Sequence, residues 1–254
     1  MVVGGEARLS SGDAVSIFVD NGGVRLHALD NGRLDALSPP VLVVPGMGEH
    51  ADEYAWTLDR LGDRRVVVVD VRGRGRSDAP ATGYAWEDHV GDLRAVAESL
   101  EVDRPIMVAF SRGSSYALGY ALQFPDRVRG LVVGDYYARH VGLPEHYVQR
   151  QLEMRIRGVP VAQRMPEHVV RGVIVEGREV PLWGRLVELR CPTLVIRGGR
   201  RGRVVTDELA EQWQTSLPSV ELATIVPAGH DVWSRDLDAY LAVLGPFLER
   251  IDAG

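Results

Sequence analysis

Short, continuous apolar runs recur along the chain and are typical of strands buried on both faces of a sheet. They lie at residues 41–44, 66–69, 106–110, 131–133, 193–197 and 220–226. Between them lie stretches with helical spacing, such as 87–100, in which the apolar residues share one face. Further helices are predicted at 53–61, 114–124, 206–216 and 234–251. This alternation predicts an α/β fold with a mostly parallel sheet covered by helices on both faces.

A hairpin is predicted at the start of the chain. Two β-rich runs, 14–19 and 24–29, flank the sequence Asp-Asn-Gly-Gly at 20–23. Asn-Gly between such runs is a strong signal for a tight antiparallel turn. With this pair at one edge, the predicted sheet has eight strands.

The pattern changes between residues 136 and 190. This segment is rich in arginine, glutamate, proline and isolated aromatics, and its helical stretches, near 145–157 and 166–172, are weak. Strand–helix alternation resumes at 191. We therefore predict an α/β core formed by 1–135 and 191–254, with 136–190 inserted as a small helical cap.

Composition narrows the classes of function. The chain has 254 residues and a net charge of −6, so no bulk basic field favours a nucleic-acid partner. Every basic residue is arginine, which excludes lysine Schiff-base chemistry. The single cysteine, Cys191, excludes an intrachain disulfide and leads into an apolar run, as a small buried hydrophobe would.

No membrane partner is expected, because no apolar run is long enough to span a bilayer. Residues 1–15 lack the basic start and apolar centre of a signal peptide. These two observations predict a cytoplasmic protein.

Ser111 stands where the apolar run 106–110 meets the helix predicted at 114–124. Strand, sharp turn and helix with a serine at the apex describe a nucleophile elbow, whose usual pattern is Gly-x-Ser-x-Gly. Small residues flank the serine because the two backbones nearly touch there. Here the pattern is Ala-Phe-Ser-Arg-Gly at 109–113, with alanine for one glycine. A simple helix N-cap is the alternative role for this serine.

A serine nucleophile needs a base, and His230 is the candidate because it follows the last predicted strand on a loop. Of the seven histidines, only His50, after the Pro-Gly-Met-Gly turn at 45–48, is a rival. The Gly-x-Gly loop at 72–77 follows a later strand and does not open a helix. It therefore does not predict a dinucleotide site.

Six stretches together resemble the α/β-hydrolase fold family along nearly the whole chain: V-L-V-V-P-G-M-G, V-V-D-V-R-G-R-G-R-S-D, A-F-S-R-G-S, R-V-R-G-L-V-V-G-D, C-P-T-L-V-I-R-G-G and P-A-G-H-D. The resemblance implies that Ser111 attacks the substrate and His230 is its base. It also implies that the backbone N–H groups of Met47 and Arg112 form the oxyanion hole. Here Pro45 replaces the usual histidine, which leaves the backbone donors in place.

The triad acid departs from the common pattern of that family. Most members carry it after the strand equivalent to 193–197, where this chain has arginines. A subset carries it after the preceding strand, where Asp135 stands, and the chemistry requires only a carboxylate near the histidine Nδ1. Asp207 and the absence of any acid remain alternatives. Either a solvated loop or the binding of an anionic substrate group would explain Arg200, Arg201 and Arg203.

Family position makes four aromatic residues candidate pocket walls or ordinary packing between cap and core: Tyr136, Tyr137, Trp183 and Trp233. The implied function is serine hydrolysis of an ester, lactone or thioester of a small to medium molecule, without a metal or organic cofactor. The alternatives are a C–C bond hydrolase, acyltransferase or lyase on the same scaffold, or a ligand-binding protein without turnover. The expected partner is a small-molecule substrate, and the sequence does not indicate an oligomeric state.

Overall fold

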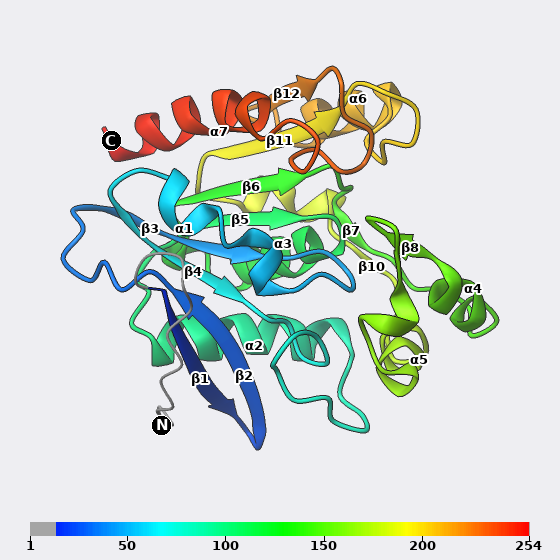
Figure 1. The fold of residues 1–254 in the computed structure, drawn as a ribbon. Helices are drawn as coiled ribbons and strands as arrows, with labels where there is room; N and C mark the ends of the chain where they lie inside the picture. The colour runs from blue at the N-terminus through cyan, green and yellow to red at the C-terminus, as the bar shows by residue number, and fades with distance from the viewer. Residues whose placement is uncertain (1–13, 254) are drawn as a thin grey trace.

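An eight-stranded sheet forms the centre of the computed structural model, which describes residues 14–253 (Figure 1). The strands follow the order β1-β2-β4-β3-β5-β6-β11-β12. The first two pair as the predicted edge hairpin, β2 also runs antiparallel to β4, and all other pairs are parallel. The strand bounds are β1 (Val15–Asn21), β2 (Val24–Asp30), β3 (Ser38–Val44), β4 (Arg64–Val69), β5 (Ile106–Phe110), β6 (Gly130–Gly134), β11 (Thr193–Gly198) and β12 (Glu221–Ile225).

Helices cover both faces of this sheet, as the alternating pattern predicted. One face packs in a single hydrophobic cluster with α2 (Trp86–Ser99), α3 (Arg112–Gln123) and α6 (Asp207–Ser216). The other face packs against α1 (Thr57–Arg60) and α7 (Leu237–Asp252). Consecutive strand residues enter the two clusters alternately, as the pleat requires.

The helix predicted at 53–61 is wrong in its length. The structure has a 3₁₀ turn, η1 (Ala51–Tyr54), followed by the four-residue α1. The amide of Ala55 bonds the carbonyl of Asp52, and that of Leu58 bonds the carbonyl of Ala55. These tight i→i+3 bonds replace the α-helical ladder at the junction.

The segment between β6 and β11, for which we keep the name cap, lies beyond the carboxyl ends of the core strands in Figure 1. It has a small hydrophobic cluster of its own, in which α4 and α5 pack together and receive Tyr84 from the core. Its elements are β7 (Arg139–His140), α4 (Tyr147–Glu153), β8 (Arg155–Ile156), β9 (Val159–Pro160), η3 (Val161–Gln163), α5 (Glu167–Val175), β10 (Val180–Pro181) and η4 (Trp183–Glu188).

Residues 1–13, which carry most of the segment without a signal-peptide pattern, lie outside the described part of the chain. Within residues 14–253, none of the helices is both long and apolar enough to cross a membrane.

Candidate active site

Ser111 lies at the apex of a strained turn between β5 and α3. Its backbone has φ +50° and ψ −131°, a conformation that a non-glycine residue adopts only when its surroundings impose it. Gly113 explains the need for small neighbours, since a Cβ there would lie 2.3 Å from the carbonyl oxygen of Pro45. Ser111 occupies the N-cap position, but its side chain makes no capping hydrogen bond, so the N-cap alternative is wrong.

Three side chains that are distant in sequence form one line of hydrogen bonds. His230 Nε2 lies 2.9 Å from Ser111 Oγ, and His230 Nδ1 lies 2.8 Å from Asp135 Oδ2. The carboxylate accepts a hydrogen bond from Nδ1–H, and this tautomer leaves the Nε2 lone pair facing the serine hydroxyl. The rival His50 instead contacts the carbonyl of Arg164 in the cap at 3.4 Å.

Asp135 is fully buried and held from several sides. It has φ +44°, and its carboxylate accepts the amides of Val204 at 2.7 Å and Val205 at 3.1 Å. Both amides belong to the loop after β11, where the family resemblance would place the acid. That loop here supplies hydrogen-bond donors to an acid carried by the neighbouring strand β6.

Asp207, the other candidate acid, faces away from this line. Its side chain is 68% exposed and pairs with Arg197 at 2.7 Å and Arg203 at 3.1 Å. The hydrogen bond from Arg197 and the charge of Arg203 lower the pKa of this carboxyl. Arg200 and Arg201 are exposed, as in a solvated loop.

Two elements that carry the predicted oxyanion donors lie beside Ser111. The amide of Arg112 is the first of helix α3 and has no acceptor within the helix. Met47 belongs to the turn after β3, and this turn approaches the nucleophile closely. A Cβ on Gly46 would lie 3.2 Å from the Ser111 Cβ.

The chain is similar to known proteins of one fold. A family model described as alpha/beta hydrolase fold matches residues 39–136. N-formylmaleamate deformylase of Pseudomonas putida is 26% identical over 272 aligned residues, which cover 93% of this chain and 99% of that protein. An enol-lactonase structure from Burkholderia xenovorans has a TM-score of 0.78 at 19% identity and covers 91% and 99% of the two chains. An esterase structure from Exiguobacterium antarcticum has a TM-score of 0.75 at 19% identity and covers 91% and 98%.

The chain has the α/β-hydrolase fold.

In this α/β-hydrolase-fold protein, a buried carboxylate supports the turn beside the nucleophile, and the sequence analysis missed it. Glu49 is 2% exposed, and its Oε2 accepts the Gly46 amide at 2.7 Å and the Tyr54 hydroxyl at 2.5 Å. Burial raises the pKa of the Glu49 carboxyl, although the nearby Arg157 cation opposes this. The only signal in the sequence was an acidic residue directly after the Pro-Gly-Met-Gly turn.

Arg157, on the turn between β8 and β9, ties the cap to the core. It donates to Glu49 at 2.5 Å and to Asp231, the neighbour of His230, at 2.9 Å. Its guanidinium also lies over the ring of Trp233, 4.3 Å from the centroid. One cap side chain therefore contacts both the turn after β3 and the histidine loop of the hydrolase fold.

The four predicted wall residues have packing contacts. Tyr136 and Tyr137 pack with ring centroids 4.3 Å apart, and Trp183 packs edge-on against Trp213 at 5.2 Å. Trp213 donates its indole proton to the Tyr136 carbonyl at 3.1 Å. Trp233 lies in the hydrophobic cluster on the opposite face of the sheet. Their role as walls of a substrate pocket stays a prediction.

A second serine–histidine–aspartate line lies inside the hydrolase core. Ser16 Oγ is 2.5 Å from His27 Nε2, and His27 Nδ1 is 2.7 Å from Asp70 Oδ2. Ser16 sits within β1 and not at a strained turn or a helix start, and Arg76 donates to its hydroxyl at 3.0 Å. This line therefore lacks the exposed apex and the amide donors that the Ser111 site has, and we interpret it as structural.

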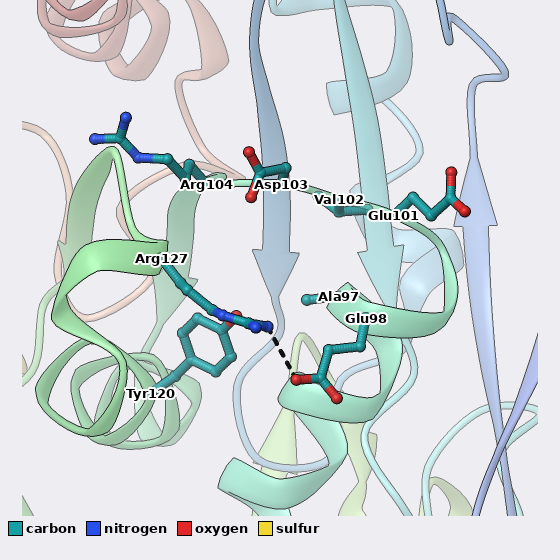
Figure 2. A pocket seen from close by; sticks show the side chains of 8 residues that line it. All are labelled: Ala97, Glu98, Glu101, Val102, Asp103, Arg104, Tyr120 and Arg127. Atoms are coloured by element: carbon teal, nitrogen blue, oxygen red, sulfur yellow. Dashed lines mark hydrogen bonds and ion pairs between the residues drawn. The ribbon is translucent and has the colours of Figure 1, made fainter.

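The hollow in Figure 2 lies at the opposite edge of the sheet, beside the segment that enters β5. It has a volume of about 310 Å³ and is lined largely by charged side chains, including the ion pair of Arg127 and Glu98 at 2.9 Å. Ser111 follows the other end of β5, so this hollow is separate from the candidate active site.

Proposed function

We propose that this protein is a serine hydrolase that cleaves an ester, lactone or thioester of a small to medium organic molecule. The observation that carries the proposal is the line from Ser111 Oγ through His230 to the Asp135 carboxylate, with distances of 2.9 and 2.8 Å. The positive φ of Ser111 at the head of α3 supports it, because this conformation exposes the hydroxyl at the carboxyl edge of the sheet.

In the proposed mechanism, Ser111 attacks the substrate carbonyl while His230 Nε2 takes the hydroxyl proton. Asp135 holds the imidazole in the required tautomer and stabilises its charged form. The amides of Met47 and Arg112 donate to the oxyanion of the tetrahedral intermediate. His230 then protonates the leaving group and activates water, which releases the acid from the acyl-enzyme.

The names of the similar proteins support hydrolysis as the reaction type: deformylase, enol-lactonase and esterase. A serine at position 111 disfavours the aspartate-nucleophile chemistry of dehalogenases and epoxide hydrolases of this fold. Acyl transfer, C–C cleavage and elimination use the same serine and histidine, and a non-water acceptor that resolves the acyl-enzyme would reveal transfer.

A fluorophosphonate probe tests the proposal. We expect wild-type protein to be labelled at Ser111, and both Ser111→Ala and His230→Ala to lose the label. The matched control is Ser16→Ala, which removes the serine of the internal line and should label like wild type. If folded wild-type protein is not labelled, or the label lies on Ser16, the proposal is wrong and a ligand-binding role is favoured.

A further inference from the structure

Two buried arginines, one of them the sequence neighbour of the nucleophile, have no carboxylate partner in the described part of the chain. Arg74 is 2% exposed and Arg112 is 5% exposed. Among residues 14–253, neither has a carboxylate within 4.0 Å. Other well-buried arginines of this protein do have one, in the pairs Arg64–Asp252, Arg65–Asp30 and Arg72–Asp92.

The partners of Arg74 are neutral. Its Nη1 donates to the Arg72 carbonyl at 2.6 Å and lies 3.1 Å from His89 Nε2. The other ring nitrogen of His89 lies 2.8 Å from the Ala85 carbonyl and must donate to it, so Nε2 is an acceptor. Burial and the nearby Arg74 cation hold the pKa of His89 well below its usual value, so this imidazole carries no charge.

Arg112 repeats this arrangement on the cap side. Its Nη2 donates to His140 Nε2 at 2.9 Å and to the Val141 carbonyl at 3.1 Å, while Ser115 Oγ lies 2.9 Å from His140 Nδ1. Burial and then the Arg112 and Arg74 cations lower the pKa of His140 to about 2. Two positive charges are therefore enclosed with two neutral imidazoles.

The free edge of Arg74 has the shape that a carboxylate fits. Its Nε is buried without a partner, and its Nη2 makes no hydrogen bond to the described residues. Arg72 uses the same edge to hold Asp92 through two hydrogen bonds of 2.6 and 2.5 Å. A guanidinium presents this pair of donors at the spacing of the two carboxylate oxygens.

Other buried donors without partners lie on α3, the helix that begins with Arg112: Arg112 Nε, Ser114 Oγ and Tyr116 Oη. Tyr116 stacks on the ring of His89 at 4.3 Å, and burial, followed by the charge of Arg112, lowers the pKa of Arg74. Arg112 and Tyr116 lie one turn apart on α3, and their unsatisfied groups can donate hydrogen bonds, which suits a negatively charged group.

The cluster lies between the nucleophile and the cap. Arg112 directly follows Ser111, and His140 lies in β7 at the start of the cap. A Cβ on Gly177 in the cap would lie 3.2 Å from Arg112 Nη2. A group bound at Arg112 would therefore lie beside the cap and one residue away from the reacting serine.

We propose that Arg74 and Arg112 bind a carboxylate of the substrate, so that the natural substrate is an acyl compound with a carboxylate apart from the bond that is cleaved. This assignment rests on the proposed hydrolase function. Enclosing an unpaired charge costs several kcal/mol, and a bound anion offsets that cost. The arginines of the loop at 200–203 do not serve this role, since Arg203 pairs with Asp207 and the other two are exposed.

The test compares two esters with acyl chains of equal length, mono-p-nitrophenyl glutarate and p-nitrophenyl pentanoate. We expect kcat/KM of wild type to favour the anionic ester by at least about tenfold at low salt. In Arg74→Gln that ratio should fall to near or below one. The ratio is taken within each variant, so a general loss of activity cancels. Arg76→Gln, from the same loop, is the matched control and should keep the wild-type ratio.

A second readout does not need turnover. Sodium glutarate at ten times its Kd should raise the Tm of Ser111→Ala by about 3 °C or more, relative to sodium chloride of equal ionic strength. Adding Arg74→Gln to that protein should abolish the rise. Equal stabilisation by inorganic phosphate would show a general anion site and would overturn the assignment to a carboxylate.

The outcomes separate the two proposals. If neither ester is hydrolysed and the probe fails, the hydrolase function is wrong, whatever glutarate does to Tm. If the neutral ester is hydrolysed but wild type shows no preference and glutarate no stabilisation, the function stands and the carboxylate site is wrong. A large loss of stability in Arg74→Gln together with an unchanged ester ratio would likewise assign Arg74 a structural role.

Discussion

Replacing Asp135 by asparagine is the sharpest perturbation of the candidate site, because it keeps the side-chain volume and removes only the charge and one acceptor. Oδ2 faces two donors, the Val204 amide at 2.7 Å and His230 Nδ1 at 2.8 Å, while Oδ1 faces the Val205 amide at 3.1 Å. An amide NH₂ at either position meets at least one N–H group.

The least costly arrangement places the NH₂ at the Oδ1 position, where one hydrogen bond is lost instead of two. The buried donor that loses its partner costs about 1–3 kcal/mol of unfolding free energy. His230 then donates to a neutral oxygen, and the imidazolium formed during attack loses its anionic partner. The same substitution in a serine protease lowers kcat by about 10⁴, which corresponds to about 5.4 kcal/mol of barrier.

The assay is kcat on p-nitrophenyl acetate, with circular dichroism and urea unfolding to measure the fold and its stability. We expect Asp135→Asn to remain folded and to lose about three to four orders of magnitude in kcat. Asp207→Asn is the matched control, and its kcat should stay within about threefold because Asp207 is exposed and pairs only with arginines. Near-wild-type kcat in Asp135→Asn, with a large loss in Asp207→Asn, would refute the assignment of the acid.

Three further outcomes are expected. His89 and His140 are held neutral with depressed pKa values, so only the unfolded chain takes up protons on them below about pH 6.5. The free energy of unfolding in urea should therefore fall by about 2 kcal/mol per histidine between pH 7 and pH 5. His140→Gln should remove about half of this fall. Gly113→Ala should prevent folding or lower the free energy of unfolding in urea by more than about 3 kcal/mol, because the added Cβ would overlap backbone oxygens. A variant as soluble and stable as wild type would contradict the close packing around Ser111. Arg157→Gln should lower the unfolding free energy by about 1–3 kcal/mol because the buried Glu49 loses its cationic partner. A loss no larger than that of the exposed control Arg178→Gln would show that the Arg157–Glu49 ion pair contributes nothing to stability.

The order of elements was predictable because each depends on a local pattern. The continuous apolar runs, the Asn-Gly hairpin and the abrupt strand-to-helix change around Ser111 all appear in the structure where the periodicity placed them. The stretch 53–61 was the exception. Its tight 3₁₀ bonds arise where Tyr54 and Trp56 pack against Trp233 on a loop far away in sequence, a contact that no local pattern contains.

The contacts of the candidate site were less accessible to sequence reasoning. Spacing alone left Asp135 and Asp207 both open, and the structure separates them because the loop after β11 turns its amides toward Asp135. Glu49 and Arg157, 108 positions apart, carried no signal as a pair. The sequence also did not predict that Ser16, His27 and Asp70 form a second line of hydrogen bonds. These three residue types occur in catalytic triads, but here they meet without a strained turn at the serine.

Local sequence patterns were sufficient for the features that depend on nearest neighbours, which are the alternation of strands and helices and the small residues around Ser111. Which carboxylate reaches His230, and which arginines have no carboxylate partner among the described residues, became clear from the packed structure. Hydrophobic periodicity is a local property that each segment carries. Charge pairing in a buried site depends on distances between segments, and these exist only after the sheet, the helices and the cap have packed together.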